Sequence, residues 1–317
     1  MKKQTILVTA ILFSLCFLTV SCGFLGHDSP ARKGKKKISV LIVDGMNNHD
    51  WQRTTDNIVT ILESCGLFSV SVSTSPPGDA PDEEWTNWQP EFEKYDVVLS
   101  NFNGGHRPTG RHWPKKLERA LEEYISSGGG LVVFHAANNS FINWKAYNEM
   151  IGLGWRNKNF GQGIVIANDG TVRRVPKGKG DNPGHGKDHD FKITVLNKRH
   201  PITKGVPEKW MHPLEQLSHG QHGPADNMTV LSYAYSKDSQ KNEPMEWIVK
   251  YGKGKVYTTM LGHLWKGQSN LNFRCVGFQT MLIRAVEWIA TGKVTYPVPP
   301  DFPSAEQISI NDLLVGP

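Results

Sequence analysis

The 317-residue chain carries 36 Lys and Arg against 30 Asp and Glu, which gives a formal net charge of +6. Seven of the basic residues but only one acidic residue precede Ile38, so the rest of the chain has equal numbers of both signs. The absence of net charge from Ile38 onward argues against a nucleic-acid partner, because proteins that bind nucleic acids gather positive charge on one face. The basic N-terminal segment is expected to be a solvated spacer, with contact to anionic headgroups as the alternative.

The first residues resemble a bacterial export signal. Lys2 and Lys3 precede an apolar run over residues 6–20, and small residues follow it. A charged start, a short apolar run and a small-residue cleavage site are typical of secretory signals. The LTVSC ending resembles a lipobox, which would place a lipid on Cys22; a plain signal peptide and an uncleaved anchor are the alternatives. We expect a lipid-anchored protein of the bacterial cell envelope, on the periplasmic face of the outer membrane, with 1–21 as the signal and 22–37 as a basic linker.

Cysteine usage indicates little cross-linking. Cys65 and Cys275 are the cysteines beyond the leader, and both lie in apolar contexts. We expect two free buried thiols, with a disulfide between them as the alternative. Neither has the spacing of a metal knuckle, so any metal would be bound by His and carboxylate side chains.

From Ile38 onward the pattern alternates between strands and helices. Short apolar runs predict strands over 38–43, 68–72, 96–100 and 130–134, and helical spacing predicts helices over 54–65 and 117–126. Strands separated by helices imply right-handed crossovers and a parallel sheet that is covered on both faces. The expected fold class is α/β, a flavodoxin-like, doubly wound and mostly parallel sheet with helices on both faces.

The second half of the chain has longer connections. Residues 161–186 are rich in Gly, Lys, Asn and Asp and predict a loop with at most a hairpin around residues 168–170. Further strands are expected over 191–196, 228–234, 246–251 and 254–261, and a helix over 273–290 that ends before Gly292. We therefore expect one domain over 38–292 and a Pro-rich C-terminal extension over 293–317.

Polar side chains follow four of the expected strands. Ligands of open α/β sheets bind at the carboxyl ends of the strands, so these clusters predict one cleft. For His135 the alternative is a core histidine that hydrogen bonds to a backbone carbonyl. The clusters are Asn48, His49, Asp50 and Trp51; Asn103 and His106; His135, Asn138 and Asn139; and His263 and Trp265.

The clusters allow two kinds of chemistry. Imidazole acts as a general acid or base near neutral pH, or binds a transition metal through its unprotonated nitrogen. His135 and His263 are the candidate catalytic residues, and together with His49 they are the candidate ligands of a divalent transition metal such as zinc. The nearby tryptophans, including Trp144, would stack on sugar rings; for each of them the alternative is core packing.

Two further segments contain His and carboxylate side chains. Residues 212–220 place Glu215 and His219 four residues apart, but Pro213 and Gly220 disfavour a helix. We predict a loop over the cleft, with Glu215 as a catalytic carboxylate and His219 as a substrate contact. Residues 185–190, HGKDHD, are expected to be a hydrated surface, with a metal site as the alternative.

Taken in order, these motifs resemble the ThuA-like family. The resemblance rests on HDW at 49–51, GGGLVVFHAANN at 128–139, HPI at 200–202, EQLSHG at 215–220, EPM at 243–245, and YGKG at 251–254 with GH at 262–263. It covers residues 38 to 292. It implies a fold similar to class I glutamine amidotransferases and an association with the utilisation of trehalose and related sugars.

The comparison with amidotransferases also excludes one activity. Their chemistry requires a nucleophilic Cys at a strand-to-helix elbow. The corresponding elbow here is expected at residues 134–137, FHAA, and has neither Cys nor Ser at its apex. Glutamine hydrolysis is therefore not expected. Where the family often has an Asp-Glu pair, this chain has Glu215 and Gln216, which retains a single carboxylate.

The resulting functional expectation is an exported enzyme of carbohydrate utilisation that acts on a keto-sugar or glycoside. Beside a carbonyl, a ring C–H is acidic enough for His135 or His263 to abstract it, while Asn or a bound metal stabilises the enediolate. Lyase, isomerase and hydrolase outcomes all remain open. The alternative is a non-catalytic saccharide-binding lipoprotein. Expected partners are a saccharide or keto-saccharide and the lipid bilayer, and no nucleic acid.

Overall fold

The structure is a computed structural model that describes residues 1, 36–105 and 110–314. The expected signal peptide, Cys22 and most of the linker lie outside the described residues. Lys37–Pro317 form one compact unit. Within the described segments, no helix combines the length and the apolar character that crossing a bilayer requires.

One half of the main sheet is parallel. Its strands follow the order β2-β1-β3-β4-β14, and each neighbouring pair is parallel. β3 and β4 are buried along their whole length, which explains why their sequences are continuous apolar runs rather than alternating ones. The bounds are β1 (Ile38–Asp44), β2 (Phe68–Thr74), β3 (Val97–Ser100), β4 (Gly130–Phe134) and β14 (Gly254–Thr259).

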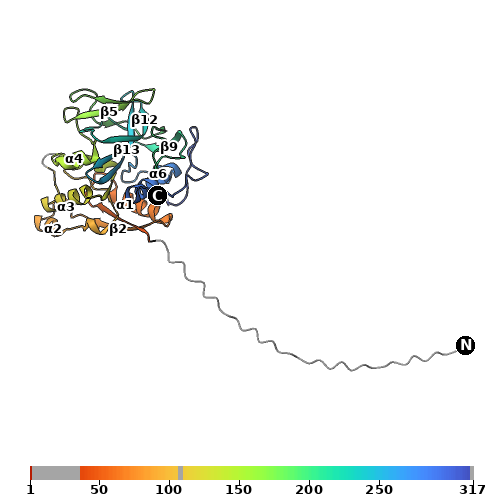
Figure 1. The fold of residues 1–317 in the computed structure, drawn as a ribbon, viewed down its shortest axis with the longest axis horizontal. Helices are drawn as coiled ribbons and strands as arrows, with labels where there is room; N and C mark the ends of the chain where they lie inside the picture. The colour runs from red at the N-terminus through yellow and green to blue at the C-terminus, as the bar shows by residue number, and fades with distance from the viewer. Residues whose placement is uncertain (2–35, 106–109, 315–317) are drawn as a thin grey trace. The chain divides into compact units, whose positions relative to one another are not determined.

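The other half of the sheet is antiparallel. From β14 the order continues β13-β12-β8-β9. Outside this order, β5 pairs with β13 and also with β6 and β11. The expectation of a mostly parallel sheet is therefore wrong for the second half; the fold is mixed α/β. The bounds are β5 (Gln162–Ile166), β6 (Val172–Val175), β8 (His189–Val195), β9 (Lys209–Glu215), β11 (His222–Gly223), β12 (Met228–Ser236) and β13 (Lys241–Tyr251). In Figure 1, β5 and β12 lie at one end of the compact unit and β2 lies at the other.

Helices pack against the sheet and against each other. α1 contacts β1, β2 and α6, while α6 also contacts β4 and β14, and α4 contacts β13 and β14. Cys275 adopts an extended conformation and divides the expected last helix into α5 and α6. The bounds are α1 (Trp51–Ser64), α2 (Asp82–Asn87), η1 (Phe92–Lys94), α3 (Lys115–Ser126), η2 (His135–Asn139), α4 (Lys145–Ile151), α5 (Leu271–Arg274) and α6 (Val276–Thr291).

The predicted polar loop at 161–186 contains more structure than expected. β5 and β6 form the hairpin expected around residues 168–170, where Gly170 has a φ of +84°. β7 (Gly184–His185) pairs with the distant β10 (Ser218–His219) in a small second sheet. Long-range pairing of this kind leaves no local sequence signal.

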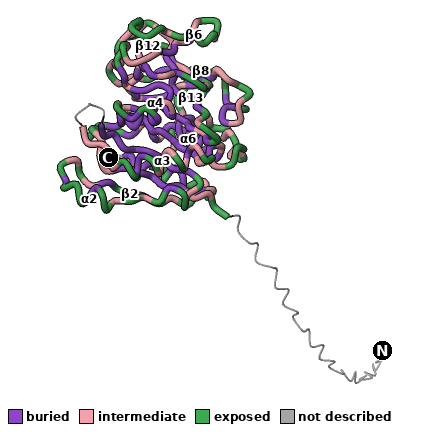
Figure 2. Tube along the Cα trace, turned by 60° about the vertical axis from the view of Figure 1, so that its left-hand side comes forward, coloured by how far each residue is buried: buried purple, intermediate pink, exposed green. Residues whose placement is uncertain are grey.

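Burial is concentrated between the sheet and the helices (Figure 2). Trp85, Trp210 and Trp247 are among the largest buried side chains, and the Trp247 indole N–H donates to the Ile151 carbonyl at 2.8 Å. Core packing therefore explains several of the tryptophans. Both Cys65, which is half-buried, and Cys275, which is buried, are free thiols.

The C-terminal extension packs onto the domain rather than trailing away from it. Arg284 of α6 donates to the carbonyl of Tyr296 at 2.5 Å, and the Val276 amide donates to the Ser309 carbonyl at 3.0 Å. Leu314 is buried. These contacts fix the extension against α6.

Candidate functional site

Three strand ends meet at the candidate site, and each turns through a residue with positive φ. Gly45 follows β1 at +112°, His135 follows β4 at +42°, and Gly262 lies beyond β14 at +105°. A Cβ at Gly262 would lie 2.3 Å from Cζ of Phe134, so the turn requires glycine. His135 occupies the left-handed region without being glycine, a strain that is typical of functional positions. The expected elbow is therefore present, with an imidazole at its apex.

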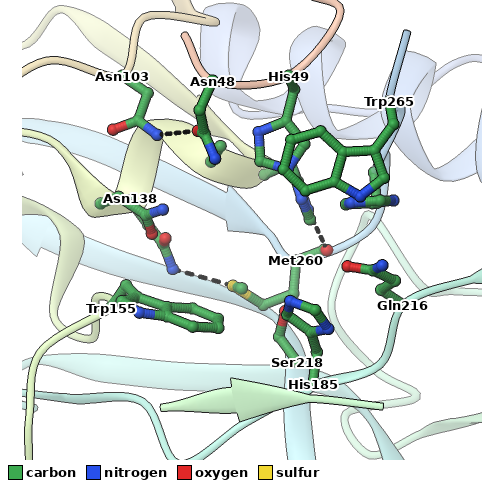
Figure 3. Close-up of a pocket in the computed structure, with 14 residues that line it drawn as sticks. Asn48, His49, Asn103, Asn138, Trp155, His185, Gln216, Ser218, Met260 and Trp265 are labelled. Atoms are coloured by element: carbon green, nitrogen blue, oxygen red, sulfur yellow. Dashed lines mark hydrogen bonds between the residues drawn. The ribbon is translucent and has the colours of Figure 1, made fainter. Parts of the chain in front are cut away.

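The turns bring three histidine rings together. Ring centroids of His49 lie 5.0 Å from His135 and 4.9 Å from His263, and those of His135 and His263 lie 5.4 Å apart. One nitrogen from each ring lies within 4.8 Å of the others. The indole of Trp265 stacks on the ring of His49 with a centroid distance of 4.3 Å, and Figure 3 shows the two side chains next to one another.

Hydrogen bonds determine which nitrogen of two rings faces the others. Nδ1 of His135 donates to the Met260 carbonyl at 2.7 Å, and Nδ1 of His49 donates to Oδ1 of Asn47 at 3.0 Å. A dashed line reaches the carbonyl oxygen of Met260 in Figure 3. Both rings are therefore Nδ1–H tautomers with an unprotonated Nε2. His263 differs, because both of its ring nitrogens are buried without a partner among the described residues.

All three rings are held in their neutral form. Burial, followed by the proximity of the other histidines, lowers the pKa of His49 and of His263 to about 2. Burial also lowers the pKa of His135, although Glu215 and the Met260 carbonyl oppose it. Neutral imidazoles are poor proton donors at physiological pH, but their lone pairs remain available.

The rings open onto a cavity of about 380 Å³. Its wall contains no Arg, Lys, Asp or Glu among the described residues. Several side-chain oxygens of the wall are buried without a hydrogen-bond partner, namely Oδ1 of Asn103, Asn138 and Asn139 and Oε1 of Gln216. The lining residues are Asn48, His49, Asn103, His135, Ala136, Asn138, Asn139, Trp155, His185, Gln216, Ser218, Met260, His263 and Trp265.

Comparison with known proteins identifies the family. A family model described as ThuA, trehalose utilisation, matches residues 39–289. The chain belongs to the ThuA family. A ThuA-like protein from Parabacteroides merdae ATCC 43184 is 35% identical with a TM-score of 0.80, over 87% of this chain and 98% of that one. A ThuA-like protein from Bacteroides uniformis ATCC 8492 is 18% identical with a TM-score of 0.55, over 84% and 96% of the two chains, a likeness of fold alone. No curated protein matches the chain.

In this ThuA family member, most of the predicted rim residues line the cavity. Eight of them do so: Asn48, His49, Asn103, His135, Asn138, Asn139, His263 and Trp265. His135 combines both alternatives, since it hydrogen bonds to a backbone carbonyl and also lines the cavity. His106 lies outside the described residues.

The remaining predicted contacts lie elsewhere. Asp50 stands at the N-cap position of α1 without a side-chain capping hydrogen bond, Trp51 is the first residue of that helix, and neither lines the cavity. Trp144 is only 7% exposed and packs in the core against Tyr147, as in the alternative given for each tryptophan, and it does not line the cavity. His219 is half-buried in β10, outside the cavity wall.

Glu215 is not placed as a catalytic carboxylate. It is fully buried at the end of β9, and its oxygens accept the amides of Gly262 at 2.7 Å and His263 at 3.0 Å. Oε2 also lies 3.1 Å from Nδ2 of Asn272 and 3.3 Å from Nε2 of His212. Residues 212–215 of the predicted loop thus belong to β9 and residues 218–219 to β10, and the Glu215 carboxylate fixes the turn that carries His263.

The cavity wall also contains residues that the sequence analysis did not select as site residues. Gln216 and Ser218 line the cavity while Glu215 and Leu217 point into the core, an alternation that is the period of an extended chain. That signal was readable in the sequence. His185 is exposed at the rim, 6.3 Å from the His263 ring centroid and 5.9 Å from that of Trp155, so the hydrated segment at 185–190 does contribute to the site. His185 belongs to the two-residue strand β7, which is too short to show a periodicity, whereas Trp155 is one of the tryptophans expected to stack on sugar rings and does line the cavity.

Proposed function

We propose that this protein is an enzyme of carbohydrate utilisation that acts on a neutral saccharide, a keto-sugar or glycoside, in the cavity beside His49, His135 and His263. The observation that carries the proposal is the wall itself. Unpaired amide oxygens from Asn103, Asn138 and Asn139 would accept hydrogen bonds from hydroxyl groups. A buried acceptor without a partner costs about 1–3 kcal/mol, so a ligand that supplies several O–H donors is favoured.

The dimensions and aromatic groups of the cavity suit the same ligand. A volume of about 380 Å³ lies within the range of small-molecule sites. Trp155 and Trp265 belong to the wall and offer apolar ring surface against which the C–H face of a sugar can pack. A phosphorylated or carboxylated sugar would find no Arg or Lys partner among the described lining residues.

The chemistry favoured by the site is metal-assisted rather than proton transfer by the buried histidines alone. With pKa values of about 2, His49 and His263 are weak bases. A Lewis acid at their lone pairs would polarise a carbonyl and stabilise an enediolate.

We infer that the enzyme is an exported lipoprotein held at the periplasmic face of the outer membrane through Cys22. Support comes from the charged start, the apolar run and the LTVSC sequence. We also infer a flavodoxin-like, doubly wound arrangement for the parallel half of the sheet. The strand order β2-β1-β3-β4-β14 supports it, because it corresponds to the flavodoxin order 2-1-3-4-5.

Turnover of 3-keto and unmodified disaccharides by the wild-type protein and by Asn139→Leu and His135→Ala tests the enzymatic proposal. We expect turnover on at least one substrate class, a raised KM in Asn139→Leu and loss of kcat in His135→Ala, with each variant folded by circular dichroism. Saccharide affinity without turnover would instead favour a binding lipoprotein. Neither affinity nor turnover for any neutral saccharide would overturn the proposal.

A further inference from the structure

The three-histidine cluster has a property that saccharide binding does not explain. Both ring nitrogens of His263 are buried, and neither has a partner among the described residues. His263 as a whole is 2% exposed. Buried polar side-chain atoms nearly always have a partner, and an orphaned one indicates a missing ligand, water or ion.

The other two rings are already oriented toward His263. Their Nδ1–H groups are used by Asn47 and by the Met260 carbonyl, which leaves Nε2 of His49 and of His135 as lone-pair donors. Metal-binding histidines almost always donate their second ring nitrogen in this way, because the bond fixes both tautomer and ring direction. The structure therefore holds two rings in the state that a metal requires.

The third ring is fixed through its backbone. Glu215 accepts the His263 amide at 3.0 Å, and Nδ2 of Asn272 donates to the His263 carbonyl at 2.8 Å. Trp265 covers the outer face of His49 by stacking. The cluster is thus held from behind and from the side, while the cavity lies in front of it.

We propose that His49, His135 and His263 bind one divalent transition metal, with an open coordination position that faces the cavity. Three imidazole nitrogens within 4.8 Å of one another form a donor set that suits zinc, cobalt or nickel. Three protein ligands leave the fourth position of a tetrahedral ion for water or substrate, as in catalytic zinc sites. The site would take a hydroxyl or carbonyl oxygen of the cavity ligand. The identity of that ligand rests on the proposed function, whereas metal binding itself does not.

Titration of the full chain with Co²⁺, after treatment with EDTA and removal of the chelator, tests this site. We expect one Co²⁺ per chain, visible d–d absorption of a four- or five-coordinate ion, and displacement by one equivalent of Zn²⁺. His49→Ala and His263→Ala should each lower the affinity for Co²⁺ more than about 100-fold. This loss is larger than the one expected when only the hydrogen-bond partner of a metal ligand is removed. His219→Ala, a half-buried histidine outside the cavity wall, is the matched control and should bind Co²⁺ like the wild type.

Two results would overturn the metal site. One is the absence of stoichiometric Co²⁺ and Zn²⁺ binding by the folded wild-type chain. The other is binding that His49→Ala and His263→Ala leave unchanged, which would indicate an adventitious ion elsewhere. If His263→Ala does not fold, His49→Ala decides alone, because His49 is only partly buried. Metal binding without any saccharide turnover would sustain this inference while the proposed function failed.

Discussion

The carboxylate of Glu215 accepts the backbone amides of two consecutive residues, Gly262 at 2.7 Å and His263 at 3.0 Å. It does so while fully buried, with Nε2 of His212 3.3 Å away. Charge-assisted hydrogen bonds of this kind are stronger than neutral ones. Glu215 therefore positions His263 from behind without reaching the cavity.

Replacement of Glu215 tests this positioning role. In Glu215→Gln one acceptor oxygen becomes an NH₂ group that opposes a backbone N–H, so the turn at His263 should shift. We expect the Co²⁺ affinity to fall about 10–100-fold. Glu246→Gln is the matched control, since Glu246 is equally buried but bonds to Ser232 and Tyr257. Equal Co²⁺ affinities in folded Glu215→Gln and wild type would contradict the role.

The turn before His263 is predicted to tolerate no side chain. Gly262→Ala combines a φ of +105° with a Cβ placed 2.3 Å from Phe134, whereas Gly66→Ala meets a φ of +71° and open space. Backbone strain alone costs about 1–3 kcal/mol. Chemical denaturation should therefore show a larger loss of the free energy of unfolding for Gly262→Ala than for Gly66→Ala. Equal losses would show that the turn can adapt.

Trp155 is predicted to stack on the bound saccharide. Trp155→Ala should weaken binding of a neutral disaccharide by about 10-fold, equivalent to about 1.4 kcal/mol. Trp155→Phe retains an aromatic face and should recover most of the affinity. Calorimetric titration of the three proteins provides the measurement, and an alanine variant with wild-type affinity would exclude the indole as a binding surface.

His200 is predicted to make stability depend on pH. Burial lowers the pKa of His200 to about 4, and its Nδ1 accepts the Ile202 amide at 3.3 Å, which requires the neutral ring. Between pH 6.5 and 4, His200 is protonated in the unfolded chain but neutral in the folded protein. The contribution of the neutral His200 ring to the free energy of unfolding is therefore complete above pH 6.5 and is lost as pH falls toward 4. The loss is at most about 1.4 kcal/mol per pH unit, and less for a half-buried ring.

His200→Asn keeps a side-chain acceptor but cannot titrate in this window. Its free energy of unfolding, measured by urea denaturation from pH 7 to pH 4, should fall less steeply than that of the wild type. Parallel curves for the two proteins would show that His200 does not titrate on unfolding.

Cys22 is predicted to carry the membrane anchor. Cys22→Ala should release the protein from the membrane fraction and abolish incorporation of labelled fatty acid, since no other residue of the LTVSC sequence carries a thiol that could form the thioether. Persistent fatty-acid labelling of Cys22→Ala would contradict lipidation at this position.

Much of the site could be predicted from the sequence because strand ends have a local signature. β1, β3 and β4 are apolar runs directly followed by Gly45, Asn101 and His135, and parallel strands bring such ends to one edge. The convergence of His49, His135 and His263 follows from this rule. Their mutual distances do not, because these depend on the positive-φ turns at His135 and Gly262.

The errors arose where tertiary context outweighs local signals. Pro213 indicated a loop, yet β9 is at the end of the sheet order and pairs with β8 through an irregular register, where a missing N–H costs little. Trp144 resembled a site residue because of its neighbours in the sequence, but it faces the core. His185 reaches the cavity through the pairing of β7 with β10, which no local pattern specifies.

The central claim is that the cavity selects neutral saccharides, and a competition between charged and neutral ligands tests it most directly. Calorimetric titration of the metal-free protein, after treatment with EDTA and removal of the chelator, with a disaccharide, its 3-keto form and its 6-phosphate would compare their affinities. The account predicts that at least one neutral form binds 10-fold or more tightly than the phosphate, because the described wall offers oxygen acceptors and no Arg or Lys. Equal or tighter binding of the phosphate in the same cavity would contradict it.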